Sequence, residues 1–175
     1  MNLLVLDFET YFSDDYTLKK MTTEAYIRDP RFETLGCGFI GLKDIVTGEP
    51  LPPTWCNGPD LHYPFDTVDW SNTAVLAHHA QFDGLILSHH YGIKPRFWYD
   101  TLSMARLMLG VHLSVGLDNL ARHFALQGKT VPYNEFRGKR FADLDRGLLG
   151  RLGAGCLHDC ELTLTIFQKL LHGDY

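Results

Sequence analysis

Short apolar runs fill the first part of the chain, and apolar residues at helical spacing fill the rest. Leu3 to Leu6 is a continuous apolar run that ends in charged residues, which is typical of a strand buried on both faces. Further short runs predict strands over residues 34–42, 54–56, 74–77 and 97–99. The first part of the chain is therefore expected to form a sheet.

Helical spacing begins after the run at 74–77. Residues 81–90 have a helical pattern, Asp100 is a suitable N-cap for a helix, and the polar residues 128–139 are typical of a loop. The apolar stripes of the later helices are Leu102, Ala105 and Leu109, then Leu117, Leu120, Ala121 and Phe124, and finally Cys156, Cys160, Leu164, Phe167 and Leu171. This order predicts an α/β fold with a central mixed sheet flanked by helices, as one domain over residues 1–175.

Length and composition narrow the class of protein. A chain of 175 residues, 45% of them hydrophobic, can bury a real core but is too short for a complete polymerase. No apolar run approaches the roughly 20 residues that a membrane span needs, so no membrane partner is expected. The four cysteines form no CxxC pair, which disfavours zinc and disulfides and indicates a reducing, cytoplasmic setting, in the host cell if the source is a bacteriophage.

The net charge of −5 hides an uneven distribution. Residues 1–83 carry 5 Lys and Arg against 13 Asp and Glu, whereas residues 84–175 carry 11 against 8. Such asymmetry favours a nucleic-acid partner for the second half, although ordinary scatter of surface charge explains it equally well.

The first strand ends in two acidic residues. Because side chains alternate along a strand, Asp7 and Glu9 are expected on one face and Phe8 on the other. Two adjacent carboxylates at the end of a buried strand repel each other unless a cation compensates them, and hard oxygen ligands suit Mg²⁺ or Mn²⁺. A solvated strand end is the simpler alternative.

Two further acids fall at helical positions. Asp83 lies in the first turn of the expected helix 81–90, where a carboxylate also complements the helix dipole. Asp159 lies one step off the apolar stripe of the last helix, so it should be half-buried and in need of a partner. Together with Asp7 and Glu9 these acids supply enough charge for two metal ions about 4 Å apart, which can promote phosphodiester cleavage.

The chain resembles the DEDD (DnaQ-like) 3′–5′ exonucleases, and more narrowly the proofreading domain of bacteriophage family A DNA polymerases. The matching segments, in order along the chain, are Leu6–Thr10, Thr17–Phe32, Ala77–Leu87, Tyr99–Arg106, Gly138–Leu144 and Cys156–Phe167. The resemblance covers nearly the whole chain and implies an RNase H-like fold.

The resemblance also implies roles for the four acids. Asp7 would bridge two divalent metal ions, Mg²⁺ or Mn²⁺. Glu9 and Asp159 would complete the tighter site, and Asp83 would serve the second ion, partly through water.

Other positions match residues near the 3′-terminal nucleotide in this family. Phe8, Thr10 and Phe82 are expected there, although Phe82 is equally suited to the core. The family's second motif usually has Asn four residues before its Asp, and here that residue is His79. His79 is expected either to tune substrate contact or to be a structural histidine.

The third motif departs further from the family. Its tyrosine subtype has Tyr four residues before the last Asp, where this chain has Gly155, and the histidine subtype has His five residues before, where it has Ala154. Three explanations stay open: metals alone activate the water, another group replaces the tyrosine, or activity is weakened. His158 could act only if Gly153 and Gly155 make the helix irregular, and Gly155→Tyr is expected to raise the cleavage rate.

The sequence therefore predicts a metal-dependent 3′–5′ exonuclease that releases nucleoside monophosphates from the 3′ end of single-stranded DNA, with a polymerase domain or subunit as its partner. One alternative is an exonuclease-fold module that binds DNA 3′ ends or scaffolds a polymerase without cutting. Another is an RNase H-like endonuclease, which the order of the motifs disfavours.

Overall fold

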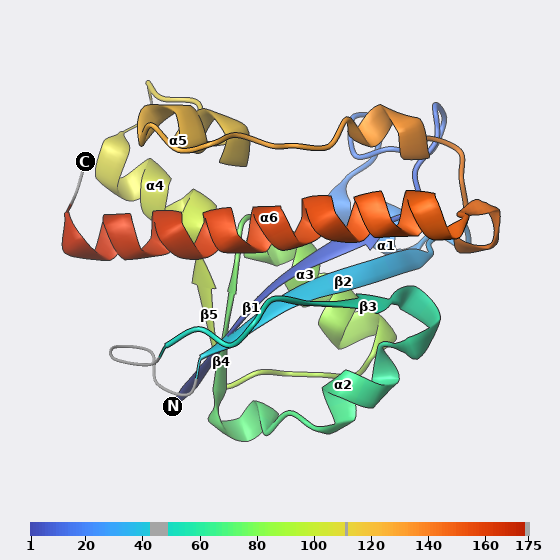
Figure 1. Cartoon of the computed structure of the whole chain (residues 1–175), viewed down its shortest axis with the longest axis horizontal. Helices are drawn as coiled ribbons and strands as arrows, with labels where there is room; N and C mark the ends of the chain where they lie inside the picture. Colours follow the sequence, from blue (N-terminus) through green and yellow to red (C-terminus); the bar gives the residue numbers. More distant parts are fainter. Residues whose placement is uncertain (43–48, 111, 174–175) are drawn as a thin grey trace.

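Five strands form one mixed sheet at the centre of the molecule (Figure 1). The computed structural model describes residues 1–42, 49–110 and 112–173. The sheet order is β3-β2-β1-β4-β5, so the first strand lies in the middle. The strands are β1 (Asn2–Thr10), β2 (Thr34–Leu42), β3 (Thr54–Asn57), β4 (Thr73–Ala77) and β5 (Phe97–Asp100).

The central strand joins two kinds of pairing. β1 pairs antiparallel with β2, from Leu3 opposite Leu42 to Thr10 opposite Thr34, and parallel with β4. β3 continues the antiparallel side and β5 the parallel side. The sheet is thus mixed, as the sequence predicts.

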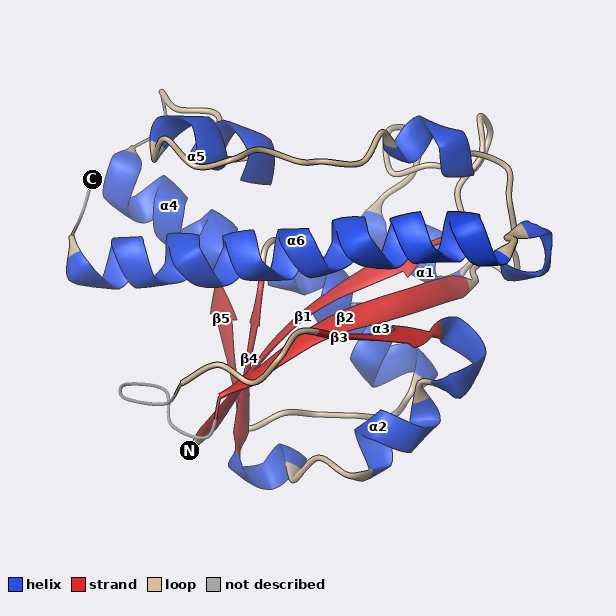
Figure 2. Cartoon of the chain, in the orientation of Figure 1, coloured by secondary structure: helices blue, strands red, loops and turns tan. Residues whose placement is uncertain are grey.

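Helices cover both faces of this sheet (Figure 2). On one face the long C-terminal helix α6 lies across the strands, where Cys160, Leu164 and Phe167 pack against Leu3 and Val5. On the other face α2 and α3 enclose an aromatic core. The helices are α1 (Thr23–Arg28), α2 (His62–Asp66), α3 (Ala80–His90), α4 (Thr101–Leu109), α5 (Leu117–His123) and α6 (Arg146–His172).

Glycines let α6 approach β2 and β3 closely. A Cβ atom on Gly38 would lie 3.0 Å from the Cys156 sulfur, so glycine is needed where the helix crosses this strand. The Trp55 ring lies between two further glycines, because a Cβ would lie 2.1 Å from it on Gly36 and 2.9 Å from it on Gly153. The glycines of β2 and α6 therefore serve close packing.

Several short elements of the fold differ from the sequence prediction. The helices α1 and α2 lie in stretches where no helix was predicted, and the expected loop 128–139 contains a short 3-10 turn, Tyr133–Phe136. The irregularity at Gly153 and Gly155 that a catalytic role for His158 would require is absent, since α6 is a continuous α-helix through both residues. None of the helices in the described ranges is long and apolar enough to cross a membrane.

Candidate active site

Three of the predicted acids line one cavity beside the end of β1. Asp7 and Glu9 lie on the α6 face of the strand, the face that carries Leu3 and Val5, as side-chain alternation predicts. Asp159 reaches the same place from α6. All three line a cavity of about 310 Å³.

Asp83 completes the group from behind the strand. It lies in the first turn of α3, is almost fully buried, and accepts a hydrogen bond of 3.2 Å from the backbone N–H of Phe8. Burial raises its pKa well above the usual value, and the charge of Asp7 raises it further. The structure therefore brings together all four predicted acids, with Asp83 set deeper than the other three.

The cluster concentrates negative charge in a place shielded from water. Burial raises the pKa of Asp7 from 3.8 to about 7, and the charge of Asp159 adds to this effect. Burial also raises the pKa of Glu9 well above its usual value, followed by repulsion from Asp7. Such a cluster is stabilised by a cation.

Two residues that the sequence analysis missed supply hydrogen-bond donors to this cluster. The Lys129 ammonium pairs with Asp159 Oδ2, and it also lies 5.0 Å from the centre of the Tyr133 ring. The Tyr133 hydroxyl donates to Asp159 Oδ2 at 3.2 Å and lies within hydrogen-bonding reach of Glu9, where it lowers the pKa of that carboxyl. We call residues 128–139, which carry both side chains, the donor loop.

No periodicity in the sequence could have identified Lys129 and Tyr133. Both lie in a polar segment outside the predicted strands and helices. The sole signal was indirect: a tyrosine is absent at Gly155 and present in the loop that precedes α6.

The site fits divalent metal ions. Asp159 Oδ1 is buried and has no hydrogen-bond partner among the described residues, so one carboxylate oxygen is free to ligate. Ligand atoms of Asp7, Glu9 and Cys156 lie within 4.8 Å of one another. Burial holds the pKa of the Cys156 thiol well above its usual value, and its sulfur donates to the Asp7 carbonyl at 3.2 Å. The carboxylates are therefore the available ligands, and oxygen ligands suit Mg²⁺.

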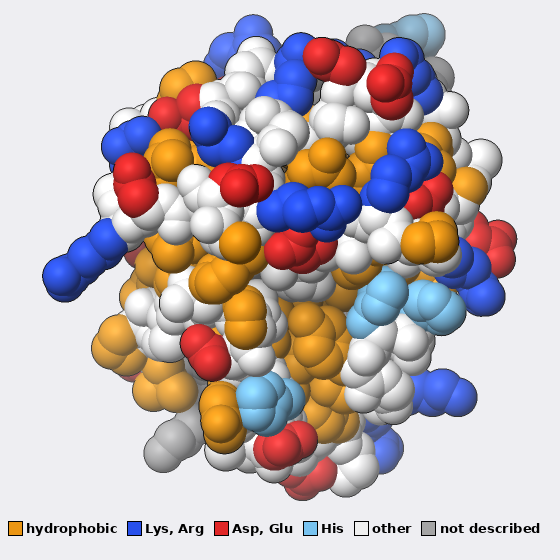
Figure 3. Space-filling view, turned by 90° about the vertical axis from the view of Figure 1, so that its right-hand side faces the viewer, with side chains coloured by type: hydrophobic (Ala, Val, Ile, Leu, Met, Phe, Trp, Pro, Cys, Tyr) orange, Lys and Arg blue, Asp and Glu red, His pale blue; other side chains and the backbone are white. Residues whose placement is uncertain are grey.

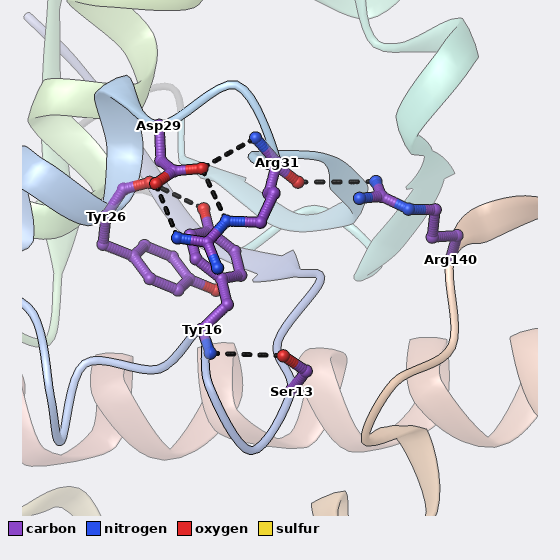
Figure 4. Close-up of polar contacts among 6 residues, drawn as sticks. All are labelled: Ser13, Tyr16, Tyr26, Asp29, Arg31 and Arg140. Atoms are coloured by element: carbon purple, nitrogen blue, oxygen red, sulfur yellow. Dashed lines mark hydrogen bonds and ion pairs between the residues drawn. The ribbon is translucent and has the colours of Figure 1, made fainter.

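A network of hydrogen bonds holds residues 13–31, the segment that carries the cavity residue Tyr26 (Figure 4). Tyr26 lines the cavity, and its carbonyl accepts a 2.6 Å hydrogen bond from the Tyr16 hydroxyl. Arg31 binds Asp29 through two side-chain hydrogen bonds of 2.8 Å, and the Arg31 carbonyl accepts from Arg140 at 3.4 Å. The residues after β1 are thus tied to the segment that leads into α6.

Basic side chains at this end of the molecule are paired with acids. Figure 3 looks onto this end, where Lys and Arg side chains gather among acidic ones across the upper part of the view. Arg137 pairs with Asp14 and Arg140 with Glu33, which joins the two halves of the sequence, and Arg151 pairs with Glu135 within the second half. Two basic residues of the second half therefore neutralise acids of the first.

Comparison with known families identifies the family of the chain. A family model described as 3′–5′ exonuclease matches residues 67–172, which is more than half of the chain. The chain belongs to the 3′–5′ exonuclease family. No curated protein sequence matches it significantly.

Solved structures confirm the fold of this exonuclease-family chain. NrnC from Brucella melitensis matches 98% of the chain and 75% of its own length, at 15% identity and a TM-score of 0.56. The structure of Brucella melitensis NrnC bound to pGG matches 98% of the chain and 74% of its own length, at 15% identity and a TM-score of 0.58. The catalytic core of RRP6 from Trypanosoma brucei matches 98% of the chain and 42% of its own length, at 12% identity and a TM-score of 0.58. The predicted RNase H-like, DnaQ-like fold is thereby confirmed.

The three residues predicted near the 3′-terminal nucleotide all border the cavity, but their side chains differ in what they contact. Phe82 and Thr10 line the cavity, and the Thr10 hydroxyl lies 2.9 Å from that of Tyr26. Phe8 also borders the cavity, but its ring packs in the core, stacked 6.0 Å from the ring of Tyr91. The Phe8 side chain is therefore a core residue.

The backbone conformation of His79 explains why histidine is tolerated where this family usually has Asn. It adopts a left-handed conformation, with φ of 70°, immediately before α3, and its N–H donates to Asp100 Oδ1 at 2.8 Å. Asn, Asp and His are the non-glycine residues most often found in this conformation. His79 does not line the cavity in the described structure, so the exchange fits the turn between β4 and α3.

The third motif of this exonuclease-family chain is rearranged around Gly155. The His158 ring nitrogen Nε2 lies 3.0 Å from the Gly128 carbonyl, so this side chain anchors the start of the donor loop. A Cβ atom on Gly155 would lie 2.7 Å from Val131 Cγ2 and 3.2 Å from the Tyr133 hydroxyl. The donor loop fills the space that the side chain of Gly155→Tyr would need, so this variant would have to displace the loop, and its effect on the cleavage rate stays a prediction.

Proposed function

We propose that the chain is a metal-dependent 3′–5′ exonuclease that hydrolyses the last phosphodiester bond of single-stranded DNA and releases nucleoside monophosphates. One observation carries the proposal: four acids from β1, α3 and α6 converge at one end of the sheet in a chain of the 3′–5′ exonuclease family. The expected role is proofreading for a DNA polymerase domain or subunit.

The acids would hold two divalent ions, Mg²⁺ or Mn²⁺. Asp7, Glu9 and Asp159 face the cavity directly, and Asp83 lies behind Asp7, close enough for the charges of the two to affect each other. Bound ions supply stabilisation of charge on the phosphate oxygens and lower the pKa of water. The chain itself fixes the carboxylates on regular elements, as such a site requires.

The other residues that line the cavity suit the 3′ end of a single DNA strand. Phe82 and Tyr26 are aromatic side chains against which a base can pack without sequence preference. Lys129 places a cation at the same cavity, where it can bind a phosphate oxygen. Structures of NrnC with bound Mg²⁺ and with pGG, on a similar fold, support a divalent ion and a nucleic acid as ligands.

A second candidate is an exonuclease-fold module that binds 3′ ends without cutting. Gly155 favours it, because the family's tyrosine is missing from the helix. All four acids are nevertheless present, three of them lining one cavity and Asp83 buried behind it, which a binding module does not need. Catalysis is therefore the better-supported proposal.

One experiment separates these functions. Purified protein is incubated with 3′-labelled single-stranded DNA and Mg²⁺ or Mn²⁺, with an EDTA control, an Asp7→Ala variant and a parallel single-stranded RNA substrate. Labelled mononucleotide that requires both the metal and Asp7 supports the exonuclease. Binding without cleavage supports the module, internal cuts support an endonuclease, and faster release from RNA contradicts the DNA preference.

A further inference from the structure

The position that lacks a tyrosine on α6 is filled by a tyrosine from another element. Tyr133 comes from the donor loop, and its hydroxyl would be 3.2 Å from a Cβ on Gly155. The same hydroxyl donates to Asp159 at 3.2 Å. A loop side chain thus reaches the carboxylates through the space that a larger residue at 155 would occupy.

The packing of the donor loop depends on that space. Val131 Cγ2 would be 2.7 Å from a Cβ on Gly155, which is closer than Cβ contacts in real proteins. Downstream, the Tyr133 ring packs in one apolar cluster with Phe136 and Leu152. His158 holds the upstream end through the Gly128 carbonyl. The loop is therefore fixed on both sides of Tyr133.

The Tyr133 hydroxyl differs from the other hydroxyls at the cavity. Those of Thr10 and Tyr26 lie 2.9 Å from each other, and Thr17 Oγ1 accepts from a backbone N–H. Tyr133 alone among the described cavity residues brings a hydroxyl to the carboxylates. A hydroxyl can both donate and accept, which carboxylates and an ammonium cannot.

We propose that Tyr133 is a catalytic residue, whose hydroxyl is delivered by the donor loop across Gly155 and orients the water that attacks the scissile phosphate. This inference rests on the exonuclease function proposed above. In the reaction the water oxygen forms a bond to phosphorus while the bond from phosphorus to the 3′ oxygen of the preceding nucleotide breaks. The water gives up one proton, and the departing 3′ oxygen takes one up from solvent.

The test removes one oxygen atom. Tyr133→Phe should lower kcat for mononucleotide release by about 100-fold, the usual cost of one positioned donor. Three quantities should stay within about twofold of wild type: KM, the affinity for single-stranded DNA in EDTA, and the affinity for Mn²⁺ measured by calorimetry. The thermal midpoint should stay within a few degrees. Tyr63→Phe makes the same change at an exposed tyrosine of α2 and should leave kcat unaltered.

A second pair of variants moves the hydroxyl without deleting it. Gly155→Ala places a methyl group against Val131, so it should shift the donor loop and lower kcat by about 10-fold. Adding Val131→Gly removes both Val131 carbons that would clash, Cγ2 at 2.7 Å and Cβ at 2.9 Å, and should restore kcat to within about threefold of wild type.

The outcomes are separable. If wild type releases mononucleotides and Tyr133→Phe matches its kcat, the inference is overturned and the exonuclease function stands. The same holds if Tyr133→Phe loses DNA affinity and thermal stability in proportion to kcat, because the residue is then structural. If the wild-type protein releases no mononucleotide with Mg²⁺ and none with Mn²⁺, both the exonuclease function and the role of Tyr133 are contradicted.

Discussion

The acidic residues and the donor loop build the same cavity in different ways. Asp7 and Glu9 are fixed by strand pairing in the middle of the sheet, and Asp159 lies in the middle of a 27-residue helix. Lys129 and Tyr133 are held by packing and by a histidine contact to the loop backbone. The carboxylates proposed to hold metal ions thus lie on a strand and a helix, whereas the donors reach them from irregular chain.

The two parts also depend on each other. Without metal, the carboxylates repel one another, and burial prevents water from screening them. Lys129 offsets part of that charge by pairing with Asp159. The donor loop is therefore expected to matter for stability when metal is absent and for chemistry when metal is present.

The largest effect should come from neutralising one acid. Asp7→Asn keeps the shape of the side chain but removes its charge, so mononucleotide release should fall by at least about 1,000-fold. The metal-free protein should become more stable, because repulsion with Glu9 and Asp159 is relieved. Urea unfolding in EDTA checks the second part. A variant that loses stability along with activity would mean that Asp7 acts mainly as a structural residue.

The pH dependence of stability tests the same repulsion. Because the pKa of Asp7 rises from 3.8 unfolded to about 7 folded, the folded state binds more protons over this interval, and stability falls as pH rises through it. The loss should be on the order of 2–4 kcal/mol in EDTA, and saturating Mg²⁺ should reverse it. His78 acts in the opposite direction, since burial lowers its pKa to about 4.

Subtracting the profile of Asp7→Asn isolates the acidic contribution from that of His78. The difference in unfolding free energy between wild type and Asp7→Asn should widen between about pH 4 and pH 7 and then level off. A difference that is flat with pH would mean that Asp7 is already ionised throughout.

Removing the cation of the donor loop should have an intermediate effect. Lys129→Met leaves the Asp159 carboxylate without its ion pair, so the metal-free protein should lose about 1–2 kcal/mol of stability. Saturating Mg²⁺ should shrink this loss, and mononucleotide release should fall by about 10-fold. Lys94→Met, at an exposed lysine away from the cavity, is the matched control. An equal loss with and without Mg²⁺ would assign Lys129 to packing rather than to charge.

The sequence predicted the acidic residues of the site but not Lys129 and Tyr133 of the donor loop. Period-2 alternation on β1 and helical spacing on α6 are local patterns, and they placed Asp7 and Glu9 on one face of the strand and Asp159 on α6. The prediction that Asp159 is half-buried was wrong, since its side chain is buried against the sheet. The position of Tyr133 depends on a contact between a loop and Gly155 that no periodicity records. The resemblance alone pointed to a gap at 155, without indicating what fills it.

The fold shows the same division. All five strands were predicted within a few residues, because their apolar runs are continuous. The helices α1 and α2 were missed because six and five residues carry too little periodicity to detect. The order of the strands depends on pairing between distant segments, which local patterns do not encode.

The smallest effect concerns a second glycine of α6, two residues from Gly155. Gly153→Ala would place its Cβ 2.9 Å from the Trp55 ring, which cannot retreat because Gly36 lies against it. The clash should outweigh the gain in helix propensity and cost about 1–2 kcal/mol of stability, whereas kcat should be unchanged. Gly150→Ala, on the same helix with open space around it, should instead stabilise by about 0.5–1 kcal/mol. Urea unfolding and mononucleotide release measure both. If Gly153→Ala lowered kcat as Gly155→Ala is expected to, general distortion of α6 would explain both variants, and the separate role of the donor loop would be lost.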